Sequence, residues 1–267
     1  MVSPSASSRS PSLVPAVARA VAVMDLLARQ REPISMAHVA AALDLPKSSV
    51  HGLCNTLLNF GYLRRADNGA LQIGPSVMSL AEAFVASTSV AGEFDALWRG
   101  ASAPDETLIL SVLNGAEVIY VAVRNGSRPL GLAFTIGMRL PAHLAATGKA
   151  MLAYLPASRV RALYPQPPAT PLPRLTGHGV ATVGELLSEL AAIRESGHSV
   201  DDEGIREGVV ALAAPVFDAT GRPVAGLAVC LNKAVLNARQ LERQRQIVMQ
   251  AALTLSQRLG APRGVNG

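Results

Sequence analysis

The sequence predicts an α+β protein in which a small helical domain precedes a larger domain of helices packed on a mainly antiparallel sheet. Two observations support this prediction. Apolar residues recur at helical spacing through the first part of the chain, whereas the second part contains several long apolar runs typical of strands. The 267 residues suffice for one small and one larger core. We expect domains at residues 14–74 and 105–260, joined by a linker helix and connection at residues 75–104.

The composition is apolar, with 49% hydrophobic and 16% charged residues, but no run approaches the roughly 18 apolar residues that a membrane span needs. We therefore expect the apolar excess to lie in cores and subunit contacts. Residues 1–13 are rich in Ser and Pro, which predicts a disordered tail instead of a secretory signal; residues 261–267 form a second expected tail. Cys54 and Cys230 lie in apolar segments, which suits reduced thiols in a cytoplasmic protein, and no Cys/His spacing suits zinc. We expect neither metal nor cofactor.

Three helices and a hairpin are predicted in the first domain. The first helix, within residues 14–30, has an apolar stripe formed by Val17, Val21, Met24 and Leu27. Ser35 is placed to cap the second helix, and Pro46 to begin the third. Two short strands are expected around the turn Asp67-Asn68-Gly69. This order of elements is that of a winged helix-turn-helix domain, whose third helix can enter the major groove of double-stranded DNA.

Polar residues on the third helix and the hairpin are the candidate DNA contacts. Four of them can donate to and accept from base edges: Ser48, Ser49, His51 and Asn55. Three others suit phosphates: Lys47, Arg64 and Arg65. Residues 1–75 have seven basic and four acidic residues, a net charge of +3, against +2 for the remaining 192 residues. The alternative is an ordinary solvated helix surface, because helix-turn-helix patterns also occur by chance.

The rest of the chain predicts a connecting helix followed by strands and helices. Residues 75–98 have no turn signal and predict one helix. Strand candidates are TLILSVL, EVIYVAV and PLGLAFT, with a tight-turn signal at Asn114-Gly115. Helices are expected around AATGKAMLAYL and GELLSELAAIRESG, the latter with Thr182 and Glu185 at capping-box spacing. The long strands GVVALAAPVFD and GRPVAGLAVCL precede a final helix at residues 236–259.

Several longer motifs follow one another along the chain: VARAVAVMDLLA, LDLPKSSVHGLCNTLLNFGYL, Gly74-Pro75, GMRLPAHLAATGKAMLA, DDEGIREGVVALAAPVFDATGRPVAGLAV and LSQRLG. Their order and spacing resemble those of the IclR family of bacterial transcriptional regulators. The resemblance implies an N-terminal winged helix-turn-helix domain and a C-terminal GAF-like effector-binding domain. It also implies a homodimer or tetramer, the latter a dimer of dimers, in which a small-molecule effector changes the hold on operator DNA.

The resemblance further implies an effector pocket between the helix after LPAH and the late strands. Carried over by position, its lining residues are Ala146, Thr147, Asp201, Val209, Ala211, Ala228 and Cys230. Helix-start amides and the Thr147 hydroxyl suit a carboxylate. Several relatives have serines where Ala228 and Cys230 stand, so a more hydrophobic acid, such as an aromatic one, is expected here. The alternatives are core packing for the apolar positions and a surface location for Asp201.

Gly52 departs from the family pattern, in which an arginine often follows the Ser-Val-His run. Such an arginine could pair with guanine and discriminate between bases by about 1–3 kcal/mol, whereas glycine costs a helix about 1 kcal/mol relative to alanine. Two interpretations remain open. In the first, the position contributes little to DNA recognition and its neighbours read the bases. In the second, the missing side chain lets the helix backbone approach the groove or a thymine methyl group.

Two rival classes of protein are less consistent with the sequence. Cys230 with His143 and Asp201 or Asp202 could form the triad of a cysteine-dependent hydrolase, but no nucleophile motif surrounds Cys230. The Gly148-Lys149 pair lacks the other residues of a phosphate-binding loop. A second domain that only oligomerises is the other alternative. We expect a transcriptional regulator and no enzyme, acting by repression, with ligand-dependent activation as the alternative.

Overall fold

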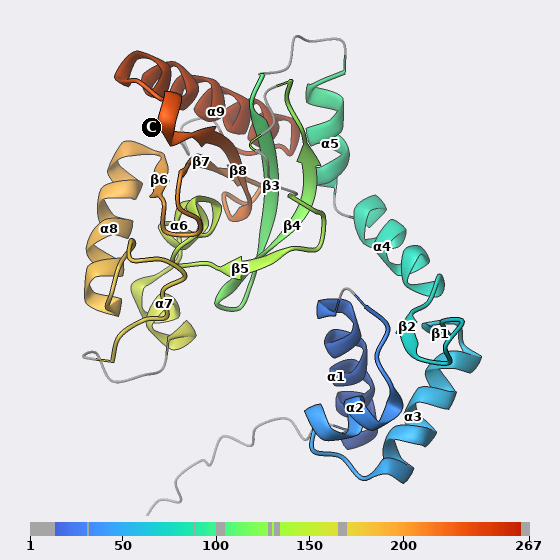
Figure 1. The fold of residues 1–267 in the computed structure, drawn as a ribbon. Coiled ribbons are helices and arrows are strands. Elements are labelled where there is room, and N and C mark those ends of the chain that lie inside the picture. The colour runs from blue at the N-terminus through green and yellow to red at the C-terminus, as the bar shows by residue number, and fades with distance from the viewer. Residues whose placement is uncertain are drawn as a thin grey trace, which may run out of the picture. The chain divides into compact units, whose positions relative to one another are not determined.

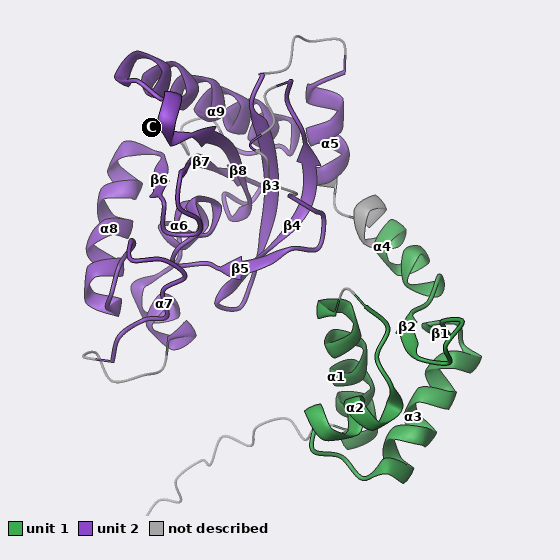
Figure 2. Ribbon diagram, viewed as in Figure 1, with its two compact units in different colours: residues 1–86 green, residues 87–267 purple. Residues whose placement is uncertain are grey.

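The structure, a computed structural model, describes residues 14–30, 32–87, 89–99, 105–127, 130, 134–164 and 170–262. The tail predicted at residues 1–13, most of the tail predicted at 261–267 and most of the strand candidate PLGLAFT lie outside the described residues. The chain folds as two compact units, residues 1–86 and residues 87–267, which Figure 2 shows in different colours. Each unit has its own hydrophobic core.

The N-terminal unit has the element order of a winged helix-turn-helix domain, as predicted (Figure 1). Its elements are α1 (Pro15–Arg29), α2 (Met36–Ala42), α3 (Lys47–Asn59), β1 (Leu63–Arg65), β2 (Leu71–Ile73) and α4 (Ser76–Ser87). The strands β1 and β2 pair antiparallel across the predicted turn, where Gly69 has a φ of +78°. Ile34 pairs with Leu71 through two backbone hydrogen bonds of 3.0 and 2.8 Å and so extends the small sheet.

The core of this unit forms where the apolar stripes of its helices meet the hairpin. Its buried residues are Val23, Leu27, Val39, Ala40, Val50, Cys54, Leu57, Leu63 and Leu71. The N-cap role predicted for Ser35 is confirmed, since its side-chain oxygen accepts from the His38 backbone N–H at 3.1 Å. Pro46 is the N-cap of α3 and not its first residue. The stripe predicted on α1 is only partly internal, because Val17 and Val21 are exposed.

Among the described residues, the C-terminal unit is built on a six-stranded antiparallel sheet with the strand order β5-β4-β3-β8-β7-β6. Its strands are β3 (Thr107–Asn114), β4 (Glu117–Arg124), β5 (Arg139–Pro141), β6 (Ser199–Asp202), β7 (Val209–Phe217) and β8 (Pro223–Asn232). The central strands are buried on both faces, which explains why their sequences are apolar throughout. The prediction of helices packed on a mainly antiparallel sheet is therefore confirmed.

Helices cover both faces of this sheet (Figure 1). The helices of the unit are α5 (Ser89–Leu97), α6 (Ala146–Leu152), α7 (Ala157–Leu163), α8 (Val183–Ser196) and α9 (Ala238–Arg258), with a 3₁₀ turn at Lys233–Val235. Helices α5 and α9 pack on one face, and α6, α7 and α8 on the other. Strand β8 serves both cores, since Leu227 and Val229 face the α9 side while Ala228 and Cys230 face α6.

The stretch predicted as one connecting helix contains α4 and α5, which belong to different units, and residue 88 between them lies outside the described residues. Helix α4 lies in the N-terminal unit, up to residue 86, whereas α5 lies in the C-terminal unit. The reason is an apolar stripe on α5, where Val90, Phe94 and the neighbouring Trp98 are buried in the same core as α9. Among the described residues, no helix is long and apolar enough to cross a membrane, and no cluster of His, Cys, Asp and Glu could hold a metal ion.

Candidate functional site

The first candidate site is the outer surface of α3 together with β1. Helix α3 buries Val50, Cys54 and Leu57 against the rest of its unit, so its remaining faces point outward. Of the seven predicted DNA contacts, Ser49 is half-buried and six are exposed, namely Lys47, Ser48, His51, Asn55, Arg64 and Arg65. The structure thus brings all seven onto two adjoining elements of one small unit. Whether they contact DNA remains a proposal.

Two of these side chains are held by local hydrogen bonds. The Asn55 side-chain nitrogen (Nδ2) lies 3.1 Å from Nδ1 of His51, one helical turn earlier. This contact orients both polar groups on the exposed face of α3. On the hairpin, Nη1 of Arg65 donates to the Gly69 carbonyl oxygen at 2.9 Å, which ties the arginine to the turn of the wing. Arg65 therefore has a structural contact as well as a charge that could meet a phosphate.

Gly52 lies on the exposed face of α3 in open space. A Cβ atom built there would meet no heavy atom within 4 Å, so nothing in the part of the chain that the structure describes requires glycine. We expect Gly52→Ala to stabilise α3 by about 1 kcal/mol, because alanine has the higher helix propensity. Hydrogen exchange of the α3 amides should slow about fivefold wherever those amides exchange by opening of this helix.

DNA affinity of the same variant separates the two interpretations of Gly52. We expect Gly52→Ala to bind operator DNA as tightly as the original protein, because the neighbouring polar residues can still reach the bases. A loss of about tenfold or more alongside slower exchange would contradict this expectation. It would show that the backbone at Gly52 comes too close to DNA for even a methyl group.

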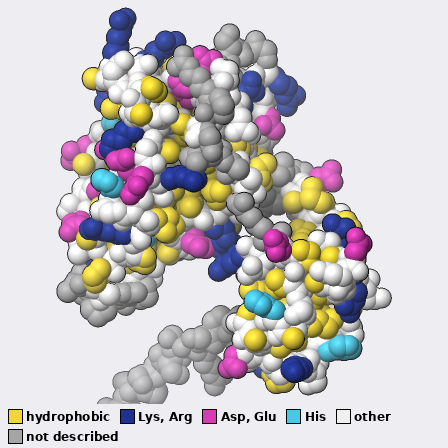
Figure 3. All heavy atoms as spheres, in the orientation of Figure 1, with side chains coloured by type: hydrophobic (Ala, Val, Ile, Leu, Met, Phe, Trp, Pro, Cys, Tyr) yellow, Lys and Arg dark blue, Asp and Glu magenta, His cyan; other side chains and the backbone are white. Residues whose placement is uncertain are grey.

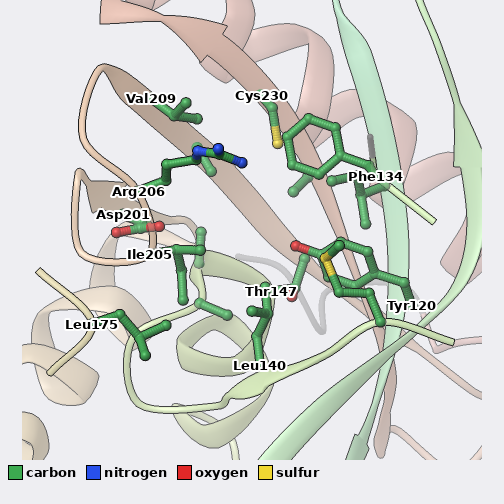
Figure 4. A pocket seen from close by; sticks show the side chains of 16 residues that line it. Tyr120, Phe134, Leu140, Thr147, Leu175, Asp201, Ile205, Arg206, Val209 and Cys230 are labelled. Carbon is green, nitrogen blue, oxygen red and sulfur yellow. The ribbon is translucent and has the colours of Figure 1, made fainter. Parts of the chain in front are cut away.

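The second candidate site is a cavity of about 300 Å³ in the C-terminal unit (Figure 4). All seven residues predicted to line an effector pocket line this cavity: Ala146, Thr147, Asp201, Val209, Ala211, Ala228 and Cys230. Nine further lining residues were not predicted from the sequence: Ile109, Tyr120, Phe134, Met138, Leu140, Ala145, Leu175, Ile205 and Arg206. Most of these lie on the edge strands and surrounding loops. Eight of the nine are apolar or aromatic and one, Arg206, is basic, and three of them lie within predicted strands, so no common signal in the sequence marks them.

Two glycines allow α6 to pack closely against the sheet and form one wall of the cavity. A Cβ atom at Gly226 of β8 would lie 2.6 Å from the Thr147 carbonyl oxygen. A Cβ atom at Gly148 would lie 2.3 Å from the Ala142 carbonyl oxygen. Because larger residues at these positions would push α6 outward, the glycines place Thr147 at the cavity wall, where its side chain is 3% exposed.

Asp201 is the one acidic residue that lines the cavity among the described residues, and its carboxyl group is buried. Its Oδ1 accepts a hydrogen bond from the Gly204 backbone N–H at 2.7 Å. Burial raises the pKa of this carboxyl group to about 6, against the opposing effect of nearby Lys149 and of backbone N–H groups. The alternative that Asp201 is a surface acid is therefore wrong.

Lys149 is a buried cation next to the cavity, but its ammonium group is already paired with other groups of the protein. Its Nζ donates to Oε1 of Glu189 and to the Val200 carbonyl oxygen, each at 2.6 Å. It lies on α6 and does not line the cavity. Lys149 therefore anchors α6 to α8 and β6, and acts on Asp201 only through its electric field.

Two further polar side chains of the cavity wall, Cys230 and Tyr120, are neutral at pH 7. Burial raises the pKa of the Cys230 thiol to about 12, with a further contribution from Asp201. Burial also raises the pKa of the Tyr120 phenol well above its usual range. Within the described part of the chain, neither the Tyr120 nor the Thr147 hydroxyl has a hydrogen-bond partner, so each could serve a bound molecule.

The geometry excludes the cysteine triad that the sequence allowed. Cys230 and Asp201 line the same cavity, but His143 does not. The His143 Nε2 atom lies 2.8 Å from the Pro173 carbonyl oxygen, to which it donates, and its ring packs edge-on against Tyr164. A thiol with a pKa of about 12 is almost entirely protonated at pH 7 and is a poor nucleophile.

Comparisons with known proteins agree with this architecture. Residues 95–257 match the family described as bacterial transcriptional regulator IclR C-terminal, and residues 16–67 match the IclR helix-turn-helix domain. The transcriptional regulator XynR of Escherichia coli is 28% identical over 94% of this chain and 99% of its own. The crystal structure of the Agrobacterium tumefaciens repressor BlcR is 35% identical, covers 93% of this chain and 98% of its own, and has a TM-score of 0.60.

A third comparison concerns a protein solved with a small molecule. An IclR homolog from Microbacterium hydrocarbonoxydans, in complex with 4-hydroxybenzoate, is 20% identical over 91% of this chain and 98% of its own, with a TM-score of 0.74. At this identity the likeness establishes a shared fold. The relatives found by sequence are regulators of transcription and not enzymes.

Proposed function

Because the chain belongs to the IclR family of bacterial transcriptional regulators, we propose that it is a cytoplasmic repressor whose affinity for operator DNA changes when a small organic acid binds its C-terminal domain. The observation that carries the proposal is the presence, in one chain, of an exposed polar face on α3 of a winged helix-turn-helix unit and of a cavity in the C-terminal unit. BlcR, the relative with 35% identity, is itself a repressor, which favours repression over ligand-dependent activation.

The size and chemistry of the cavity support a small organic acid as the effector. A volume of about 300 Å³ holds roughly ten non-hydrogen atoms, since a water molecule occupies about 30 Å³ in the liquid. Most of the wall is apolar, and its polar groups are few and convergent, as in other small-molecule sites. Phe134 and Tyr120 offer aromatic surface to a ring (Figure 4). An aromatic acid with a single ring fits these limits.

Exposed apolar residues of the N-terminal unit support a homodimer. Hydrophobic side chains gather on the surface of this unit in Figure 3. Helix α1 exposes Val17 and Val21, which are four residues apart and therefore share one face, and its N-cap residue Val14 is also exposed. Helix α4 exposes Met78 and Leu80. We propose that a second copy covers these residues, in a dimer or a dimer of dimers. Two-fold symmetry would then set the spacing of two operator half-sites.

The effector would act by favouring one placement of the two DNA-binding units over another. It can shift operator affinity only as far as its own affinities for the two placements differ. The boundary between the compact units, at residues 86 and 87, is the segment through which such a change would have to pass. The same reasoning holds for activation, so the position of the operator relative to the promoter decides between the two actions.

The test is an anisotropy titration of the purified protein against labelled DNA from upstream of its own gene, with unrelated DNA as competitor. It is repeated with aliphatic and aromatic acids, including 4-hydroxybenzoate. We expect tight binding that resists the competitor and that at least one acid weakens. Operator binding that no acid changes would contradict the effector part of the proposal. Binding that is loose and equal on all DNA would contradict the operator part, and a genome-wide binding search would then look for another operator.

Thr147→Val is expected to blunt the response to effector without changing DNA binding in its absence. The substitution keeps the shape of the side chain and removes a hydroxyl that has no hydrogen-bond partner among the described residues. A lost hydrogen bond to the effector should raise the effector concentration needed for half-maximal response about five- to tenfold. The measurement is operator anisotropy at increasing effector concentration. Loss of DNA binding without effector would instead show that Thr147 has a structural role in α6.

A further inference from the structure

Arg206 places a positive charge in the wall of the cavity. It lies in the loop between β6 and β7, and its side chain extends from this loop into the cavity in Figure 4. It is the one basic residue among those described that lines the cavity. Arg206 is also exposed to solvent, so its guanidinium group is accessible from the mouth of the cavity.

The charge of Arg206 is not neutralised by the described part of the protein. The two lysines near the cavity show the contrast. Lys149 pairs with Glu189, and Nζ of Lys233 pairs with Oδ1 of Asp202 at 2.7 Å and with Oε2 of Glu203 at 2.6 Å. Arg206 has no ion pair or side-chain hydrogen bond to any described residue, although the Asp201 carboxylate lines the same cavity. Five N–H donors therefore remain available to a ligand.

The loop that carries Arg206 is held in place without a ligand. Glu203 has a φ of +63°, in the left-handed region, and its Oε1 accepts from the Gly208 backbone N–H at 2.7 Å. The hydroxyl of Thr176 donates to the Glu203 carbonyl oxygen at 2.7 Å, and the Val209 N–H donates to the Arg206 carbonyl oxygen at 3.3 Å. These bonds fix both ends of the loop, so binding need not order its backbone.

We propose that Arg206 recognises the negatively charged end of the effector and thereby makes the cavity selective for monocarboxylic acids. This inference rests on the proposed effector-binding function of the cavity. The planar guanidinium group matches a carboxylate in a two-bond pair, and Arg206 presents it beside apolar walls. Asp201 repels a second negative charge. The preferred ligand has one carboxylate, an apolar body and at most about ten non-hydrogen atoms, and a hydroxyl or N–H group on it could donate to Asp201.

The first experiment compares matched probes on the full-length protein. Benzoate and 4-hydroxybenzoate are each titrated calorimetrically beside their neutral primary amides, and short aliphatic acids are paired with their amides in the same way. Succinate, a dicarboxylate within the size limit, is compared with butyrate and should bind more weakly than butyrate. We expect at least one acid to bind about 10- to 100-fold more tightly than its amide, because hydrogen bonds to charged groups are the stronger ones. A preference for amides, equal affinity within every pair, or no binding of any acid would overturn the proposal.

The second experiment asks whether Arg206 is the cause of the preference. In Arg206→Gln, the preference for acid over amide should disappear while binding of the amide is kept. The matched control is Arg239→Gln, which removes an exposed arginine of the same unit that does not line the cavity. Unchanged acid binding in Arg206→Gln, or an equal loss in both variants, would overturn the proposal.

Operator binding measured on the same preparations separates this inference from the proposed function. Competitor-resistant DNA binding that responds to neutral compounds alone would keep the regulator and reject the role of Arg206. Acid binding that depends on Arg206 but leaves DNA affinity unchanged would keep the inference and reject regulation by this ligand. A normal melting temperature for Arg206→Gln without ligand would show that its loss of binding is not a loss of folding.

Discussion

Replacing Asp201 by asparagine is expected to raise the free energy of unfolding of the C-terminal domain by about 3 kcal/mol at pH 7. The carboxyl group is buried, and its pKa is raised from an ordinary value of 3.8 to about 6. Each pH unit of difference corresponds to about 1.36 kcal/mol. Asparagine has nearly the same shape, can accept the same hydrogen bond from Gly204 and never carries the charge.

The sign follows from which state binds the proton more tightly. A raised pKa means that the folded protein holds the Asp201 proton more tightly than the unfolded chain does. The protonated carboxyl therefore favours folding below pH 3.8, this contribution declines between pH 3.8 and about 6, and above that it is lost. The variant and the original protein should be equally stable near pH 3.5 and should diverge steadily up to pH 6.

Urea unfolding followed by tryptophan fluorescence measures the difference in unfolding free energy between Asp201→Asn and the original protein, and it reports on the C-terminal domain. Trp98 is the single tryptophan of the chain, and it lies in the core on the α9 side of the sheet, away from the cavity. The control is Asp202→Asn, whose side chain is 59% exposed and pairs with Lys233. It should lower stability by less than about 1 kcal/mol, with no gain at pH 7. If Asp201→Asn and the original protein were equally stable from pH 4 to 7, this prediction would be wrong. Lys149 and the backbone N–H groups would then fully offset the destabilising effect of burying the carboxylate.

A gain in stability on removing Asp201 would itself bear on function. A buried carboxylate that destabilises its domain is the kind of group that proteins retain at ligand sites. Asp201 and Arg206 line the same cavity, so the Asp201→Asn variant should bind a different range of ligands from the original protein. The substitution would then raise the stability of the domain and weaken its response to the natural effector.

Much of the fold could be predicted from the sequence because local patterns and tertiary packing agree. The apolar positions Val50, Cys54 and Leu57 recur at helical spacing, and the same three residues are buried in α3. Strands β7 and β8 are apolar along nearly their whole length, since helices cover both faces of the sheet. The hairpin turn was visible as Asp67-Asn68-Gly69, where glycine permits the positive φ of the turn.

The elements that escaped prediction are short or depend on distant contacts. Strands β5 and β6 have three and four residues, too few for a pattern of alternation to show. Helix α7 has seven residues and buries only Val160. That α4 and α5 belong to different units could not be predicted, because Phe94 of α5 packs in a core whose other residues lie far away in the sequence. The exposure of Val17 and Val21 has the same origin, since a helical stripe does not reveal which part of it a monomer covers.

The candidate cavity could be predicted only where a family resemblance supplied positions. All seven such residues line it, but their role in binding an effector remains a proposal. Arg206 was missed although it lies between Asp201 and Val209, because a charged residue in a loop usually points to solvent. The strand and loop geometry that turns it toward the cavity is set by Glu203 and its partners, which no local pattern reveals.

On the DNA side, Asn55→Ala is expected to relax base preference and Arg65→Ala to weaken binding to all DNA about equally. Asn55 is exposed on α3, where its amide can both donate to and accept from a base edge, and the 3.1 Å contact with His51 orients it. Losing such a contact should reduce discrimination between the operator and a single-base variant by about 1–3 kcal/mol, or about 5- to 150-fold. Competition anisotropy against a set of single-base operator variants measures this ratio.

Arg65 should show the opposite behaviour, because a phosphate contact positions the protein without reading sequence. In Arg65→Ala, affinity for operator and unrelated DNA should fall by similar factors, and the slope of log affinity against log salt should decrease by about 1. Arg65→Lys is the matched control, since it keeps the charge but not the guanidinium bond to the Gly69 carbonyl. A restored salt slope in Arg65→Lys would identify the phosphate charge as the cause, whereas a slope that stays low would identify the wing contact.

The two variants together test whether α3 and the wing divide recognition in this way. If Asn55→Ala kept the base preference unchanged, the recognition face assigned to α3 would be wrong, and Ser48 or His51 would be the next residues to replace. If Arg65→Ala changed the base preference, the wing would read sequence, and the hairpin would have to reach a groove. Because Gly52 leaves the centre of the α3 face without a side chain, the expected loss of preference at Asn55 is large.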